Sequence, residues 1–211
     1  MMRLVAYFAA FSSIIFAMPA APPIAQAATQ LTGDARIKLL HLDEIAMRTV
    51  ENHFLPDEKR KSLTQITKEL SRGVTTADPR GLFVTLSKDG KTRACWGSVT
   101  PEHENLIAST VYTTEAALNK EYRFPPIKRS EIKKLKAQVT VVKSVDPIES
   151  IRAINPLKHG LFVRQGGRAA VLLPGECVDA HYQLVQCKLK AGIPVNTRCQ
   201  MYRITADVFH N

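Results

Sequence analysis

The residue types best suited to chemistry gather in one short stretch, where a charge, a thiol and an indole stand beside a glycine. Arg93, Cys95, Trp96 and Gly97 lie within five positions, and Trp96 is the only tryptophan of the 211-residue chain. A thiol whose pKa is lowered by a neighbouring cation or a helix N-terminus can act as a nucleophile or a redox group. We therefore take this stretch as the candidate site.

Two interpretations of Cys95 stay open. In the functional one, Arg93 lowers the pKa of the thiol at a pocket mouth and His159 accepts its proton. In the structural one, Cys95 is a small buried residue of a central strand, because free cysteine is among the most buried residue types. Strand alternation places Arg93 and Cys95 on one face, and Ala94 and Trp96 on the other. An arginine on a core face would be unusual, which favours the pocket.

Other polar residues stand beside turns and have two explanations each. Arg80 before Gly81 and His159 before Gly160 either cap neighbouring strand ends or simply belong to turns. Trp96 either stacks on a ligand or packs into the core. The candidate ligand-binding residues are Arg80, Arg93, Trp96 and Gly97, and the candidate catalytic pair is Cys95 and His159. The sequence has no Gly-rich phosphate loop, serine-hydrolase elbow or His-Glu-x-x-His helix, so the common nucleotide, serine-hydrolase and metalloprotease sites lack support and the cofactor stays unknown.

The four cysteines allow three complete disulfide connectivities. Cys177, Cys187 and Cys199 lie close in the chain, which favours one bridge within this trio and leaves Cys95 unpaired. A zinc site is less well supported, because the trio contains no Cys-x-x-Cys pair and has no closely spaced histidine pair beside it. We predict no metal site.

The N-terminus has the pattern of an export signal. A basic start at Arg3 is followed by an apolar run from Leu4 to Met18 and by Ala25-Gln26-Ala27, a small-x-small cleavage site. We predict a signal peptide over residues 1–27 and a mature domain over 28–211, located in the periplasm or outside the cell. The alternative, an uncleaved anchor, is disfavoured because the run is shorter than the roughly 20 residues of a spanning helix.

The chain is basic, with a formal net charge of +10. Cleavage after Ala27 would remove one charge, that of Arg3. A net positive charge of this size favours weak contact with anionic surfaces. The lysines and arginines are scattered along the chain, however, which argues against specific nucleic-acid binding and leaves an unknown small ligand or a protein partner. The length fits one domain, or one domain with two lobes.

The spacing of apolar residues predicts four helices and six strands, an α+β pattern. The expected helices run from near Asp34 to before Pro56, from Asp57 to Arg72, from Glu102 to Lys120 and from Asp179 to Lys190. The expected strands form two hairpins, Leu82–Ser87 with Thr92–Ser98 and Gly160–Gln165 with Arg168–Leu173, and two further strands, Lys136–Ser144 and Gln200–Phe209. We expect a long connection from Val145 to His159.

One segment of the first hairpin recurs in the second. Gly81-Leu82-Phe83-Val84 reappears as Gly160-Leu161-Phe162-Val163, and each return strand carries Arg-Ala near its start. We infer that the two hairpins are related halves of one sheet. They should then occupy comparable positions in it.

Several motifs in their order resemble the AMMECR-one domain family, whose microbial members include AmmeMemoRadiSam system protein A. They are Arg80-Gly81-Leu82-Phe83-Val84, the stretch around Cys95, Arg123-Phe124-Pro125-Pro126, Lys158-His159-Gly160-Leu161, Leu172-Leu173-Pro174-Gly175 and Lys190-Ala191-Gly192-Ile193-Pro194. The resemblance extends from about Ala35 onward. It implies a two-lobed single α+β domain, with an antiparallel sheet and hairpins flanked by helices, and the Cys95 motif near a cleft between the lobes.

The resemblance has limits that bear on function. The family motif is Leu-Arg-Gly-Cys-Ile-Gly, which Arg93, Cys95 and Gly97 match, whereas Thr92, Ala94 and Trp96 depart from it. The family brings no assigned reaction, and its associated Memo-like and radical-SAM partners would be cytosolic. We therefore expect an exported domain that binds a ligand or partner in a cleft around Arg93 and Cys95. The alternative is a thiol-dependent enzyme or redox protein that uses Cys95.

Overall fold

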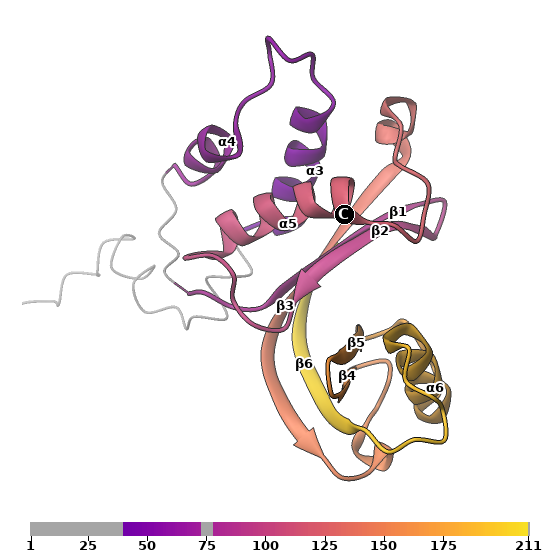
Figure 1. Ribbon diagram of the computed structural model, residues 1–211. Coiled ribbons are helices and arrows are strands. Elements are labelled where there is room, and N and C mark those ends of the chain that lie inside the picture. The colour runs from indigo at the N-terminus through magenta and orange to yellow at the C-terminus, as the bar shows by residue number, and fades with distance from the viewer. Residues whose placement is uncertain (1–39, 73–77, 211) are drawn as a thin grey trace, which may run out of the picture.

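A six-stranded antiparallel sheet runs through the molecule in the order β2-β1-β3-β6-β4-β5. The computed structural model describes residues 40–72 and 78–210. The strands are β1 (Leu82–Lys88), β2 (Lys91–Ser98), β3 (Leu135–Ile148), β4 (Gly160–Gln165), β5 (Arg168–Leu172) and β6 (Gln200–His210). Figure 1 shows the long strands β3 and β6 curving side by side through the centre of the molecule.

The two hairpins flank this central pair in equivalent ways. β1 pairs with β3 and carries β2 on its outer side, whereas β4 pairs with β6 and carries β5. The repeated Gly-Leu-Phe-Val segment thus opens the inner strand of each hairpin. The hairpins occupy comparable positions, as the repeat predicted.

The helices divide the domain into two lobes, each with its own apolar core. Helices α3 (Leu42–His53), α4 (Leu63–Leu70) and α5 (Leu106–Lys120) lie with β1 and β2, whereas α6 (Ala180–Ala191) lies beside β4 and β5 (Figure 1). The first core contains Leu42, Val84 and Leu106, and the second contains Leu161 and Cys187. The prediction of a two-lobed α+β domain is confirmed.

Capping residues set the starts of three helices. Ser62 and Gln65 form a reciprocal capping box, so α4 begins at Leu63 and the prediction of a helix from Asp57 was too long. Asn105 caps α5 and Asp179 caps α6, each through a backbone N–H in the first turn. The predicted beginning of the first helix, near Asp34, lies outside the described residues.

β3 is longer than predicted, because it continues through residues expected to form a connection. Asp146 and Pro147 pair with Arg203 and Tyr202 of β6. The pairing of β1 with β3 extends only to Val141, so this end of β3 is a sheet edge. Proline is tolerated at an edge, where its missing N–H costs no ladder bond. A short 3₁₀ helix, Ile151–Ala153, follows.

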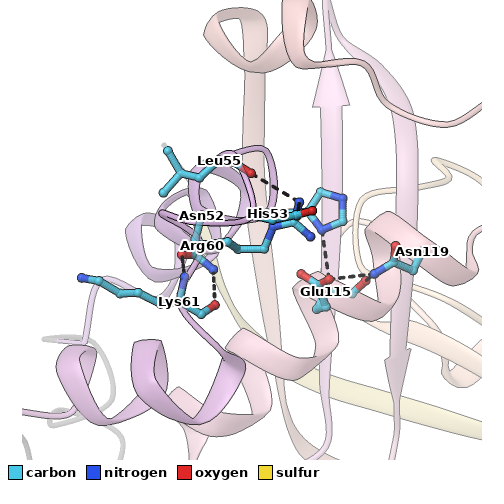
Figure 2. A network of polar contacts seen from close by, with 8 residues as sticks. Asn52, His53, Leu55, Arg60, Lys61, Glu115 and Asn119 are labelled. Carbon is cyan, nitrogen blue, oxygen red and sulfur yellow. Dashed lines mark hydrogen bonds and ion pairs between the residues drawn. The ribbon is translucent and has the colours of Figure 1, made fainter.

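A polar network attaches α3 to its surroundings (Figure 2). The Nδ1 atom of His53 lies 2.9 Å from a carboxylate oxygen of Glu115 on α5, and Asn119 donates to the same oxygen. The buried Asn52 amide donates to the carbonyl of Lys61 and accepts from its N–H, at 2.9 and 3.0 Å. Asn52 thus fixes the connection between α3 and α4.

Replacing Asn52 by Ala should lower the free energy of unfolding by about 1.5 kcal/mol, because both backbone groups of Lys61 lose their partner. Urea unfolding would measure the change. Asn119→Ala, which removes an exposed amide from the same network, is the matched control and should cost less than about 0.5 kcal/mol. Equal losses in both variants would contradict the assigned role of Asn52.

Candidate functional site

A cavity of about 480 Å³ lies between the two hairpins. Its walls come from both outer strands of the sheet, β2 with residues 95–98 and β5 with residues 169–171. Phe83 on β1 and Phe162 on β4, the equivalent residues of the repeated segment, both line it. Val171 and Leu173 add further apolar surface. Size, concavity and apolar walls are typical of small-molecule sites.

Cys95 lines this cavity as a protonated thiol. Thr85, its partner across the hairpin, donates a hydrogen bond to Sγ at 3.4 Å. Burial raises the pKa of Cys95, and the lowering effects of the Thr85 hydrogen bond and of the Lys190 and Arg123 charges do not offset it. The thiol therefore lacks the electropositive activation of a nucleophilic cysteine.

The backbone of Cys95 is held by a charged pair from the segment after α5. The N–H of Cys95 donates to Glu121 at 3.1 Å, and Arg123 donates to its carbonyl oxygen at 3.4 Å. Because β2 is an outer strand, these two groups would otherwise be unpaired. The Glu121 and Arg123 side chains thus take the place of a neighbouring strand at this point of the edge.

Glu121 is ionised although its side chain is only 4% exposed. Burial alone would raise its pKa. Hydrogen bonds from the Arg123 side chain, from the Arg123 backbone and from the Cys95 backbone outweigh burial and lower the pKa of Glu121 to about 2. The carboxylate in turn raises the pKa of Arg123. The pair is therefore a fixed part of the cavity wall.

Arg93 has a structural role beside the cavity rather than in its lining. It binds both carboxylate oxygens of Glu131 at 3.2 Å and donates to the carbonyl of Pro125. The hydrogen bond from Arg93, together with the Lys128 backbone and the Lys88 side chain, lowers the pKa of Glu131 to about 2. Arg93 thus anchors residues 125–131 along the edge of β2.

Trp96 and Gly97 both line the cavity. Trp96 is partly buried against the first core, and Lys120 Nζ lies 5.9 Å from its ring centroid. The tryptophan therefore serves the core and the cavity together. Gly97 lies so close to β1 that a Cβ atom there would stand 2.3 Å from the carbonyl oxygen of Leu82. Only glycine fits this position.

The structure places Arg80 and His159 apart from Cys95. Arg80 forms an ion pair with Asp78 at 2.8 Å and lines a separate small hollow with His103. The His159 ring accepts a hydrogen bond from the backbone N–H of Asn155 at 3.1 Å. Neither Arg80 nor His159 lines the main cavity. Burial, with the charges of Arg203 and Lys158, lowers the pKa of His159.

The expected bridge among the C-terminal cysteines is not formed, and all four cysteines are free thiols. Cys177, Cys187 and Cys199 pack in or against the second core as separate side chains. Burial raises the pKa of Cys187 to about 12, and its thiol donates to backbone carbonyls of Leu161 and Ala170. Within the described ranges, no three His, Cys, Asp or Glu side chains are arranged to hold a metal ion.

Of the residues that line the cavity, only Cys95, Trp96 and Gly97 were predicted from the sequence, and those not predicted include Glu121, Arg123, Phe162 and Lys190. The repeated segment could have identified Phe162 as the equivalent of Phe83. Arg123 was named only as part of the family-like segment Arg123-Phe124-Pro125-Pro126. Lys190 comes from α6, and nothing in the sequence indicates that the sheet curls enough to bring this helix near β2.

Comparison with known proteins identifies the family. The chain matches AMMECR1 over residues 43–210. A protein of Thermotoga maritima is 32% identical over 166 residues, which cover 77% of this chain and 92% of that protein. A protein of Methanopyrus kandleri is also 32% identical, over 74% of this chain and 81% of its own length.

A solved structure agrees with this assignment. The crystal structure of an uncharacterized protein from Pyrococcus horikoshii superposes with a TM-score of 0.68 at 25% identity, covering 81% of this chain and 89% of the other. The relatives carry no assigned reaction in their names. The chain belongs to the AMMECR1 family.

Proposed function

We propose that this AMMECR1-family protein is a binding domain that takes a small, largely apolar ligand in the cavity between its two hairpins. The observation that carries the proposal is the cavity of about 480 Å³ itself, with the paired aromatic residues Phe83 and Phe162 in its walls. A fully packed domain has few voids larger than a water molecule. A hollow of this size with apolar walls is suited to a ligand.

The geometry around Cys95 supports binding rather than thiol chemistry. A nucleophilic cysteine needs a lowered pKa and a base within hydrogen-bond reach. Here burial raises the pKa of Cys95, and the hydrogen bond to its sulfur comes from Thr85. His159, the base of the alternative proposal, has its Nδ1 atom bound to the Asn155 backbone. The thiol enzyme therefore has less support than the binding domain.

The thiols give a direct test of these alternatives. We expect Cys95 to be alkylated by iodoacetamide more slowly than free cysteine at pH 7, because burial raises its pKa. Cys187 should stay unmodified until the protein unfolds, since it is buried. Mass spectrometry of peptides from native and denatured protein would measure both. Alkylation of Cys95 faster than free cysteine near neutral pH would instead favour the thiol enzyme.

Ligand binding can be tested with a neutral apolar dye. Nile red should fluoresce when it enters the cavity, and Ala169→Phe should block it, because Ala169 lies at the cavity wall on β5. Ala153→Phe, at an exposed position in the short 3₁₀ helix, is the matched control. Equal dye binding in both variants and the wild type would contradict the proposed site.

Export is a separate part of the proposal, and its support is the sequence of residues 1–27. The mature chain recovered from the cell envelope should begin at Ala28, as intact-mass measurement would show. A chain that retains Met1 and stays with the cytosol would overturn export and leave ligand binding untouched. No helix within residues 40–72 or 78–210 is long and apolar enough to cross a bilayer.

A further inference from the structure

The cavity wall carries an excess of positive charge. Three ionised side chains line it, the carboxylate of Glu121 and the cations of Arg123 and Lys190. Glu121 and Arg123 neutralise each other, because they form an ion pair and share the backbone of Cys95. The charge of Lys190 is left over.

Lys190 is placed to meet a ligand. It belongs to the last turn of α6 and reaches β5, where its Nζ atom donates to the carbonyl of Val171 at 2.8 Å. An ammonium group has three N–H donors, so two remain for a partner. Within the described part of the chain, no carboxylate lies within ion-pair distance of it. The nearby Glu176 binds the backbone N–H of Leu173 instead.

We propose that the ligand is an amphiphilic anion, in which an apolar chain or ring occupies the cavity and a carboxylate or similar head group binds Lys190. This inference rests on the proposed function and adds the chemical class of the ligand. Phe83, Phe162 and Val171 provide contacts for the apolar part. A cation adds a charge-assisted hydrogen bond to an anionic head, and a neutral head group forms a weaker one.

The chain provides its own reporter for a test. Trp96 is the sole tryptophan and lines the cavity, so its fluorescence reports occupancy of this site. We would titrate the protein with decanoate and decyltrimethylammonium below their micelle concentrations, and with decanol below its solubility limit. Decanoate should bind about tenfold more tightly than decanol, and the cation should bind least well.

Variants then assign this preference to one side chain. Lys190→Gln should reduce decanoate affinity about tenfold, to that of decanol, and leave decanol binding nearly unchanged. Lys133→Gln is the matched control, because it removes an exposed lysine from the 3₁₀ helix Arg129–Lys134. Circular dichroism would verify that both variants fold. The comparison of the three head groups in the wild type needs no variant at all.

The outcomes separate the two proposals. Equal affinity for decanoate and decanol would overturn the anion preference and leave the binding domain intact. A preference that survives in Lys190→Gln would overturn the role of Lys190. If no alkyl ligand binds, and Nile red enters the Ala169→Phe variant as readily as the wild type, both proposals fail.

Discussion

Replacing Gly97 by Ala should lower the free energy of unfolding by about 3 kcal/mol, because the added methyl group meets the backbone of the neighbouring strand. The added Cβ atom would stand 2.3 Å from the carbonyl oxygen of Leu82 and 2.6 Å from Cα of Phe83. Both are backbone atoms of β1, which cannot rotate away as a side chain can. Gly97 also has a φ of 156°, which disfavours residues with a Cβ atom.

The strain should reach the cavity as well as the fold. Gly97 pairs with Phe83, and both line the cavity, so separation of β2 from β1 would displace an aromatic wall. Urea unfolding and Trp96 fluorescence would measure the two effects. Gly167→Ala is the matched control, because nothing lies within 4 Å of its added Cβ atom. A Gly97→Ala variant as stable as this control would show that the strands separate without cost.

Local sequence was sufficient to predict the hairpins. Asp89-Gly90 lies between two strand-like runs, and both residues adopt positive φ, of 50° and 75°, as a tight hairpin turn requires. The end of β3 was not predicted, because Asp146 and Pro147 have the composition of a turn. They can belong to a strand because this end of β3 pairs with β6 on one side only, and the local sequence does not show which strands will pair.

The candidate site also contains residues that the local sequence predicts and residues that only the tertiary structure brings together. Cys95, Trp96 and Gly97 share one strand end, so a local motif was enough to bring them together. Arg93 stands two residues from Cys95, yet Glu131, from another part of the chain, holds its side chain beside the cavity. His159 was grouped with Cys95 as the proton acceptor that a nucleophilic thiol needs, and no local pattern connects the two residues. Only the curl of the sheet decides that Lys190, rather than His159, lines the cavity with Cys95.

The curl also explains why the charged pair on β2 matters. Outer strands present unpaired backbone groups, which proteins cover to prevent association. Here β2 and β5 both line the cavity, and side chains from other segments bind their outer backbone groups. Glu121 and Arg123 bind the backbone of Cys95 on β2, and Lys190 binds the carbonyl of Val171 on β5. The groups that satisfy the two edges therefore also supply the charge of the cavity wall.

Glu121→Gln should therefore destabilise the protein strongly at neutral pH. The difference between an ordinary pKa of 4.5 and the value of about 2 in the folded protein corresponds to about 3 kcal/mol. Because the folded pKa is the lower one, this stabilisation is present above pH 4.5 and is lost as the pH falls toward 2. Glutamine keeps an oxygen for the Cys95 N–H but leaves the Arg123 charge without a partner.

The pH dependence separates this charge effect from a simple loss of packing. Urea unfolding of wild type and Glu121→Gln should differ by about 3 kcal/mol at pH 7, and the difference should shrink steadily between pH 4.5 and pH 3, because in this range the unfolded wild-type chain takes up a proton at Glu121 while the folded protein does not. Glu104→Gln, at an exposed position, should follow the wild type at every pH. If the Glu121→Gln curve ran parallel to the wild type through this range, the cost would come from altered packing. The carboxylate would then contribute nothing through its charge, and the edge of β2 at Cys95 would be held by the Arg123 hydrogen bond and the surrounding apolar contacts alone.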